Sequence, residues 1–280
     1  MCTIGALSNL NEKGQRLGFL MKTVDAGLTE TFHGFFTGPN GTRALFASMM
    51  RQRGTNIGLN QHGLAVTISY SDYRGHGSPW TKEMPTLERD TRAMACAEIL
   101  SRCSSADEAL AFLKDFVPRH PDQVGGNYLL IDCLGNIVLL EQCEGKYDFR
   151  SFSQRGYCGR ANNSHWLIQD KQANLIVPSD SLPREEAMEK FLINGRENIP
   201  RGITSDEIIS GAKYLLSSHS KRSDQLAGIC AHGLEAPGAR LFGSDPCHTL
   251  TAVICDLNEK TMHYSVGNPC QERWRKVTLD

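Results

Sequence analysis

The sequence predicts an α+β fold in which two antiparallel β-sheets stack between layers of helices. Three observations favour this fold class. The expected elements run in the order strands, helices, strands, helices, strands; hairpins join most neighbouring strands; and no β-α-β alternation appears, which argues against a doubly wound parallel sheet. Because no internal repeat or low-complexity segment marks a boundary, residues 1–280 are expected to form a single domain.

The first 70 residues are expected to form strands joined by tight turns. In order, these strands span 3–7, 17–24, 31–37, 43–50, 56–59 and 64–70. Gly38-Pro39-Asn40-Gly41 and Asn60-Gln61-His62-Gly63 are strong turn signals and predict two hairpins. The loop 71–85 that follows is long enough to suggest a functional lid rather than a plain connection.

Blocks of helices and strands make up the rest of the chain. Helices are expected over 87–102, 109–116, 183–192 and 206–216, and strands over 128–132, 137–141, 157–162, 249–255 and 262–266. Two helices start behind predicted capping boxes, Ser105-Ala106-Asp107-Glu108 and Thr204-Ser205-Asp206-Glu207. Leu134-Gly135-Asn136 and Asn258-Glu259-Lys260 are expected to close hairpins.

Composition and charge exclude several classes of function. Thirty basic against 31 acidic residues give a net charge of -1, so neither nucleic acid nor an anionic membrane is expected as a partner. No apolar stretch reaches the roughly 18 residues of a membrane span, and the chain start lacks a secretory signal, so a cytoplasmic location is expected. The ten cysteines are then expected as free thiols. No C-x-x-C or H-E-x-x-H motif occurs, so no metal and no cofactor is expected.

Cys2 is the strongest candidate for catalysis. Removal of Met1 would expose it as the first residue, with its thiol as nucleophile and its α-amino group as base. Their reference pKa values, about 8.5 and about 7.7–8.0, permit proton transfer between them near neutral pH. The apolar run 3–7 would hold the cysteine at the tip of a buried strand. A Met-Cys start that occurs by chance is the alternative.

Several segments resemble one enzyme superfamily in the correct order, from residue 1 to about residue 270. Met1-Cys2-Thr3 resembles the start of the N-terminal-nucleophile (Ntn) hydrolases of the choloylglycine hydrolase and penicillin V acylase superfamily. The resemblance is strongest to its acyl-coenzyme A:6-aminopenicillanate acyltransferase branch, and it implies a four-layer α/β/β/α sandwich. The other segments are Met21–Asp25, Gly58–Val66, Asn127–Asp132 with Gly135 and Glu141, Arg160–Trp166, Ser179–Arg184, His248–Thr251 and Gly267–Cys270.

The resemblance implies a charged pair beside the nucleophile. Lys22 stands where the family has an arginine, and a cation there favours the thiolate. Asp25 would orient the α-amino group. An ordinary ion pair of these two residues is the alternative. The sequence departs from the family pattern in Lys22 itself, in Ala26 where an aromatic residue is frequent, and in Ser164, which separates the asparagine segment from His165.

The resemblance also implies an oxyanion hole. Tyr70 stands where the family has an asparagine or tyrosine near this hole, although a tyrosine that ends a strand is also a common core residue. Asn163 matches the family's oxyanion asparagine, and Asn162 is a rival because the Asn-Asn doublet leaves the register open by one residue. Arg184 matches an arginine that organises the site electrostatically; a salt bridge at a helix start is its alternative.

The expected function is that of an N-terminal cysteine amidohydrolase that cleaves a non-peptide acyl amide through an acyl-enzyme on Cys2. Its expected substrate is a small acyl amide or acyl thioester. Three alternatives stay open: an acyltransferase that uses the same intermediate, a small-molecule-binding member impaired through Lys22, and a cysteine–histidine hydrolase that uses His248 beside Cys247. The sequence specifies neither the acyl and amine groups nor whether the chain forms a homo-oligomer.

Overall fold

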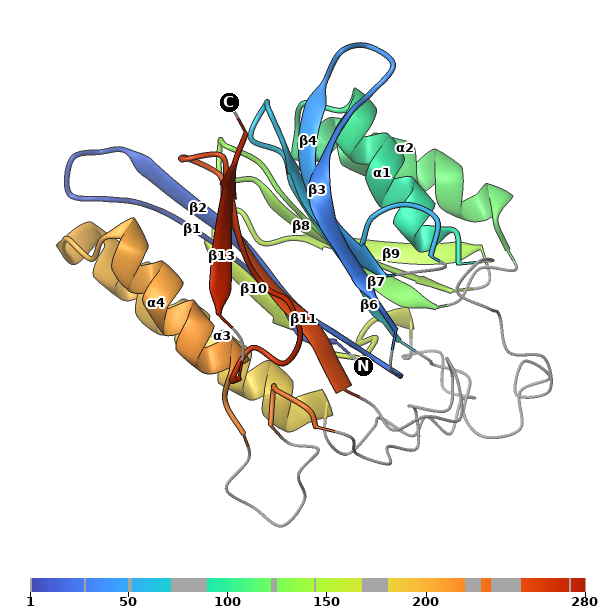
Figure 1. The fold of residues 1–280 in the computed structure, drawn as a ribbon. Coiled ribbons are helices and arrows are strands. Elements are labelled where there is room, and N and C mark those ends of the chain that lie inside the picture. Colours follow the sequence, from blue (N-terminus) through green and yellow to red (C-terminus); the bar gives the residue numbers. More distant parts are fainter. Residues whose placement is uncertain are drawn as a thin grey trace.

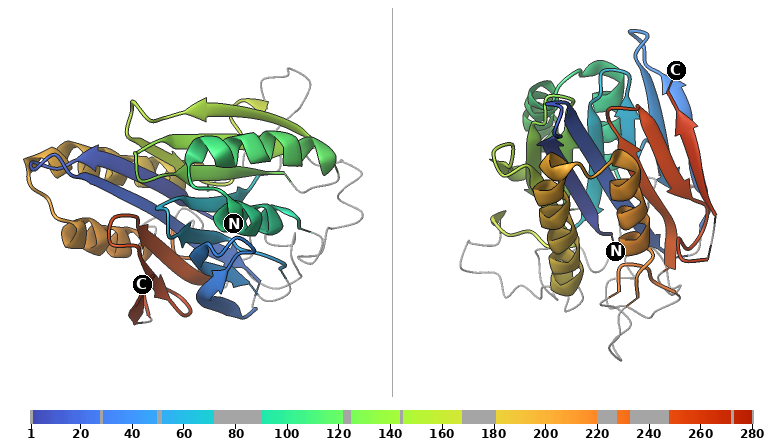
Figure 2. Two further views of the ribbon diagram at one scale, coloured as in Figure 1. Left: turned by 90° about the horizontal axis from the view of Figure 1, so that it is seen from above. Right: turned by 90° about the vertical axis from the view of Figure 1, so that its left-hand side faces the viewer.

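The protein folds as a four-layer α/β/β/α sandwich, as predicted (Figure 1). The computed structural model describes residues 2–27, 29–49, 52–71, 90–121, 125–143, 145–167, 181–219, 228–232, 248–271 and 273–279. Two antiparallel sheets face each other in the middle, and a pair of helices covers the outer face of each, as the views in Figure 2 show. Among these residues, no helix has the length and apolar character needed to cross a membrane.

The first sheet joins strands from both ends of the chain. Its six strands lie in the order β10-β1-β2-β11-β12-β13. They span Ile4–Leu10 (β1), Arg16–Ala26 (β2), Tyr157–Arg160 (β10), His248–Asp256 (β11), Thr261–Ser265 (β12) and Trp274–Thr278 (β13). β1 and β2 form a hairpin that sets Ile4 opposite Lys22. β11 pairs with the other edge of β2 and sets Thr249 opposite Asp25.

The second sheet is a seven-stranded meander in chain order, β3 to β9. Its strands span Thr31–Thr37 (β3), Arg43–Met49 (β4), Ile57–Asn60 (β5), Ala65–Tyr70 (β6), Gly126–Ile131 (β7), Ile137–Cys143 (β8) and Lys146–Ser151 (β9). The two turns predicted in the first 70 residues are confirmed, because they join β3 to β4 and β5 to β6. Gly41 (φ 84°) and Gly63 (φ 77°) supply the left-handed backbone that these turns need.

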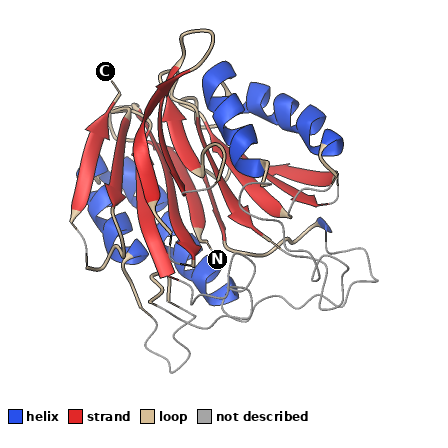
Figure 3. Ribbon diagram, turned by 45° about the vertical axis from the view of Figure 1, so that its right-hand side comes forward, coloured by secondary structure: helices blue, strands red, loops and turns tan. Residues whose placement is uncertain are grey.

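The helices α1 (Arg92–Arg102) and α2 (Ala106–Phe116) cover the second sheet, and α3 (Ser181–Asn198) and α4 (Ser205–Leu216) cover the first (Figure 3). The capping box of α4 is confirmed, since Thr204 and Glu207 make both reciprocal hydrogen bonds. The box predicted for α2 is only half formed. Ser105 accepts the Glu108 N–H, but the Glu108 carboxylate accepts from Ser104 instead of returning to Ser105.

Strands β1 and β2 are buried on both faces. Successive side chains of a strand point to opposite sides, so alternate residues pack in different layers. Ile4, Ala6 and Leu20 pack in the core between the two sheets. Phe19 and Met21 pack on the opposite side, against α3 and α4. Lys22 has the same parity as Leu20, so the strand directs a lysine into the layer between the sheets.

Some predicted elements differ from those observed. The strands β9 and β13 were not predicted, and α3 runs six residues beyond the predicted end at Leu192. The first predicted helix begins at Arg92 within the described residues, not at Leu87. Apart from Ser71, the predicted lid 71–85 lies outside the described residues.

Candidate active site

Cys2 lies two residues before the start of β1 and is buried, with 9% of its surface exposed. Its backbone nitrogen donates a hydrogen bond to Asn162 Oδ1 at 2.8 Å. In the full sequence this nitrogen is an amide, and it stands in for the α-amino group of a chain that has lost Met1. The next residue is tied to β2 on both sides, since Thr3 N–H donates to Thr23 Oγ1 (3.1 Å) and Thr23 N–H donates to the Thr3 carbonyl (2.9 Å). The residue bearing the thiol is therefore held in place.

Arg184 projects from the first turn of α3 toward Cys2 and is 1% exposed. Its Nη1 donates to the Cys2 carbonyl at 3.0 Å and to Thr3 Oγ1 at 2.9 Å. Its Nη2 donates to Asn162 Oδ1 at 2.9 Å. One planar guanidinium thus binds the main chain at Cys2 and also the asparagine that accepts from the Cys2 nitrogen.

Lys22 brings a cation to the thiol from within the core. It is fully buried in β2, and its Nζ donates to the Ile68 carbonyl of β6, across the layer between the sheets. Burial by itself raises the pKa of the Cys2 thiol, but the positive charges of Lys22 and of the amino terminus oppose it, and the pKa lies below its usual value. The predicted cation–nucleophile pair is therefore brought together.

Asp25 lies three residues further along β2 and is also buried. Its carboxylate accepts from Thr249 Oγ1 at 2.7 Å and from Thr23 Oγ1 at 3.2 Å. Burial raises the pKa of this carboxyl, although the amino terminus, Arg184 and the Thr249 hydrogen bond each oppose the rise. Sequence reasoning missed both threonines as partners of Asp25, although Thr249 lies in one of the segments that carried the resemblance.

The contact with Cys2 belongs to Asn162 and not to Asn163, which the sequence had favoured. Asn162 Oδ1 accepts from Cys2, and its Nδ2 donates to the Tyr70 carbonyl at 2.7 Å. Asn163 is equally buried, yet neither polar atom of its side chain has a hydrogen-bond partner among the described residues. Tyr70 joins the group through its main chain, and its ring lies 5.8 Å from the Arg92 guanidinium carbon.

Two buried carboxylates hold the loop that carries Asn162. Glu141 of β8 accepts from the backbone N–H groups of His165 (2.7 Å) and Trp166 (2.8 Å). Glu185 of α3 accepts from Arg160 Nη1 (3.0 Å) and contacts His165 Nε2 (3.2 Å). The sequence gave Glu141 no role and missed Glu185. A signal existed, because a carboxylate within the apolar run of β8 requires buried donors.

The cysteine–histidine alternative depends on His248 and its neighbour Cys247. His248 begins β11 opposite Ala26, and within the described part of the chain no hydrogen bond joins its ring to Cys2. Cys247 lies outside the described residues.

Comparison with known proteins relates the chain to acyl-transferring and amide-hydrolysing enzymes. Residues 10–198 match the family described as acyl-coenzyme A:6-aminopenicillanic acid acyl-transferase. Penicillin V acylase from Agrobacterium tumefaciens is similar in structure, with 13% identity, a TM-score of 0.56 and coverage of 98% of this chain and 86% of that one. The Caenorhabditis elegans ortholog of N-acylethanolamine-hydrolyzing acid amidase has 11% identity, a TM-score of 0.56 and full coverage of both chains.

A third similar structure is an arginine-to-leucine variant of conjugated bile acid hydrolase from Clostridium perfringens, with 11% identity and a TM-score of 0.54 over 99% of this chain and 97% of that one. No curated protein matches the chain in sequence. At identities this low, the structural likeness establishes a shared Ntn-hydrolase fold.

Proposed function

The chain belongs to the acyl-coenzyme A:6-aminopenicillanic acid acyl-transferase family, and from this premise we propose that it is an N-terminal cysteine amidohydrolase acting on a small, non-peptide acyl amide. The observation that carries the proposal is the buried network at Cys2. Asn162 accepts from the Cys2 nitrogen, and Arg184 binds both that asparagine and the Cys2 carbonyl. An inert chain end has no need of such a network, since buried polar groups are costly unless they are paired.

In the proposed first step, the α-amino group of Cys2 takes the proton of its own thiol after Met1 has been removed. The sulfur attacks the amide carbonyl, and the oxyanion accepts a hydrogen bond from Asn162 Nδ2, which has a second hydrogen besides the one donated to Tyr70. The α-ammonium then returns its proton to the amine, the C–N bond breaks, and the acyl group remains on sulfur as a thioester.

The charged neighbours support this step. Lys22 favours the thiolate, as the lowered pKa of Cys2 indicates. Asp25 supplies a negative charge for the ammonium that forms, and Thr23 and Thr249 orient its carboxylate.

Water resolves the thioester in a hydrolase, and an amine resolves it in an acyltransferase. The acylase, amidase and hydrolase among the similar structures favour hydrolysis. The family description favours acyl transfer, which is the second candidate. Release of free acid and formation of a new amide, measured side by side while an amine acceptor is added, distinguish the two.

The test is a screen of acyl amides and acyl thioesters with the wild type, Cys2→Ala and Cys133→Ala. Cys133 is an exposed thiol and serves as the matched control. Loss of the nucleophile is expected to lower kcat by roughly 10⁴-fold or more, and Cys133→Ala is expected to keep full activity. Mass spectrometry of the intact protein is expected to show that Met1 has been lost. It is also expected to show an acyl adduct on the wild type that Cys2→Ala does not form.

Two results would overturn the proposal. If a chain that retains Met1 turned over substrate, the α-amino group of Cys2 could not be the base, because its nitrogen would still be an amide. Loss of activity in His248→Ala, together with full activity after the terminal amine is blocked, would point to a cysteine–histidine hydrolase.

A further inference from the structure

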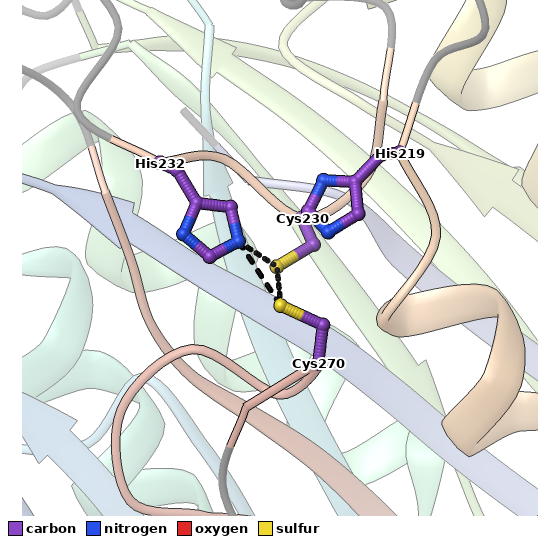
Figure 4. A group of neighbouring side chains, drawn as sticks. All are labelled: His219, Cys230, His232 and Cys270. Carbon is purple, nitrogen blue, oxygen red and sulfur yellow. Dashed lines mark hydrogen bonds between the residues drawn. The ribbon is translucent and has the colours of Figure 1, made fainter.

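Four side chains that can bind a metal ion converge near the C-terminal end of α4 (Figure 4). They are His219, Cys230, His232 and Cys270, and their ligand atoms all lie within 4.8 Å of one another. The two sulfur atoms are 3.6 Å apart. His232 Nε2 lies 3.6 Å from Cys230 Sγ and 3.0 Å from Cys270 Sγ. Figure 4 shows all four side chains directed toward a common centre.

Three of these spacings lie near the edges of a tetrahedral zinc site, and the ligand atom of His219 lies within 4.8 Å of the other three. With Zn–S of about 2.3 Å and Zn–N of about 2.0–2.1 Å, neighbouring ligand atoms stand roughly 3.3–3.8 Å apart. The two contacts of 3.6 Å fall in this range, and the 3.0 Å contact is slightly shorter. Two thiols and two imidazoles also form the donor set that zinc prefers over magnesium or calcium.

We propose that His219, Cys230, His232 and Cys270 bind one Zn²⁺ ion. On binding, each thiol releases one proton, and two thiolates with two neutral imidazoles balance the charge of the ion. Four protein ligands leave no open coordination position, so the site is structural rather than catalytic. His219 and Cys270 also line a surface cavity of about 490 Å³, which gives the ion a path from solvent.

The ion would fasten three separate segments of the chain. His219 follows α4, Cys270 follows β12, and Cys230 and His232 flank Ala231. The Ala231 N–H donates to Thr249 Oγ1 at 2.9 Å, and the Ala231 carbonyl accepts from Thr249 N–H at 3.0 Å.

That same threonine hydroxyl donates to Asp25, so zinc would help to position the carboxylate assigned to the α-amino group. This consequence rests on the proposed function, whereas the zinc site itself does not.

A disulfide between Cys230 and Cys270 is the competing use of the two thiols. It would require the sulfurs to close from 3.6 Å to about 2.05 Å. It would also need an oxidant, and it would leave the convergence of His219 and His232 without a purpose. The absence of a C-x-x-C motif predicted no metal site, but the ligands come from segments that only the fold brings together.

The test uses full-length protein without a histidine tag, purified with a reductant, loaded with Zn²⁺ and dialysed. Elemental analysis is expected to find one zinc per chain. Replacement by Co²⁺ is expected to give the visible bands of a tetrahedral ion and a thiolate-to-cobalt charge-transfer band. Cys270→Ser should weaken that band and lower zinc affinity by more than about tenfold, since even loss of an outer partner costs about that much.

Cys133→Ser is the matched control and should bind like the wild type, because Cys133 is an exposed thiol outside the group. His219→Ala, which alters an exposed side chain, tests the site if Cys270→Ser folds poorly. The proposal is overturned by zinc well below one per chain, by a cobalt spectrum without thiolate bands, or by a Cys230–Cys270 disulfide in peptides from the reduced preparation. Metal content is also measured in Cys2→Ala, so it is independent of activity.

Discussion

Two polar clusters flank Thr249, and they are built in opposite ways. The cluster around Cys2 is carried by regular elements, with Lys22 and Asp25 on one strand and Arg184 in the first turn of α3. Its members are buried and held by hydrogen bonds, several of them to the main chain. The proposed zinc ligands, His219, Cys230, His232 and Cys270, lie outside the helices and strands, and two of the four side chains are exposed. The fold itself assembles the first cluster, whereas an ion would complete the second.

The thiols of the two clusters also differ in pKa. Burial raises the pKa of both Cys2 and Cys230. At Cys2 the positive charges of Lys22 and the amino terminus overcome burial and bring the pKa below its usual value. At Cys230 the neighbouring Cys270 thiol adds to burial, and the pKa rises to about 12. The Cys2 thiol therefore loses its proton more readily than the Cys230 thiol.

Among changes to the neighbours of Cys2, the largest effect that separates the clusters is expected from Asn162→Ala. This change removes the proposed oxyanion donor and the acceptor of the Cys2 nitrogen, and it should lower kcat/KM by about 10²–10³-fold. Zinc content should stay at one per chain, because the hydrogen bonds of Asn162 within the described residues go to Cys2, Tyr70 and Arg184 and to none of the four ligands. Steady-state kinetics and elemental analysis on the same preparation measure both.

Asn163→Ala is the matched control for this change. Its side chain has no hydrogen-bond partner among the described residues, so activity close to that of the wild type is expected. A larger loss in Asn163→Ala than in Asn162→Ala would return the oxyanion role to Asn163.

The sequence predicted the cluster at Cys2 better than the cluster at Cys230 for a physical reason. Lys22 and Asp25 were assigned through the resemblance of the segment Met21–Asp25, and this segment lies within one strand, so its residues stay close together in the fold. The choice between Asn162 and Asn163 depends on one residue of register in a loop that Glu141 holds through hydrogen bonds. The local sequence does not reveal these long-range hydrogen bonds. Cys230 and Cys270 are 40 residues apart, and only the folded chain brings them together.

The missed strands have a similar explanation. β9 reads Lys-Tyr-Asp-Phe-Arg-Ser and β13 reads Trp-Arg-Lys-Val-Thr. Both lie at the edges of their sheets and have exposed polar side chains. An apolar run predicts a strand that is buried on both faces, such as β8, but it does not detect an edge strand whose side chains are mostly polar.

A smaller effect is expected from Lys22→Met, which tests why the two thiols differ. Removing the positive charge should raise the pKa of Cys2, so the acid limb of the kcat/KM profile should move to higher pH. Below that limb the rate should fall by about tenfold for each unit of displacement, and it should recover at higher pH. Lys22→Arg is the control that keeps the cation. An acid limb that stays at the same pH in Lys22→Met would mean that Lys22 does not set the thiolate population.

The smallest effect is expected from Thr249→Val, which removes the hydroxyl that joins the two clusters. Asp25 loses one neutral hydrogen bond and the Ala231 N–H loses its acceptor, so kcat/KM should fall by about tenfold. Thr251→Val is the control, because the Thr251 hydroxyl bonds to the Ser265 carbonyl and not to Asp25.

Removal of zinc turns this comparison into a test of coupling. If the ion acts on Asp25 through Thr249, zinc removal should lower the activity of the wild type and of Thr251→Val, but it should lower that of Thr249→Val much less. Changes that share one path are not additive, whereas independent changes are. An equal loss in all three proteins would mean that zinc holds the fold together without acting through Thr249, and the two clusters would then be neighbours without a functional link.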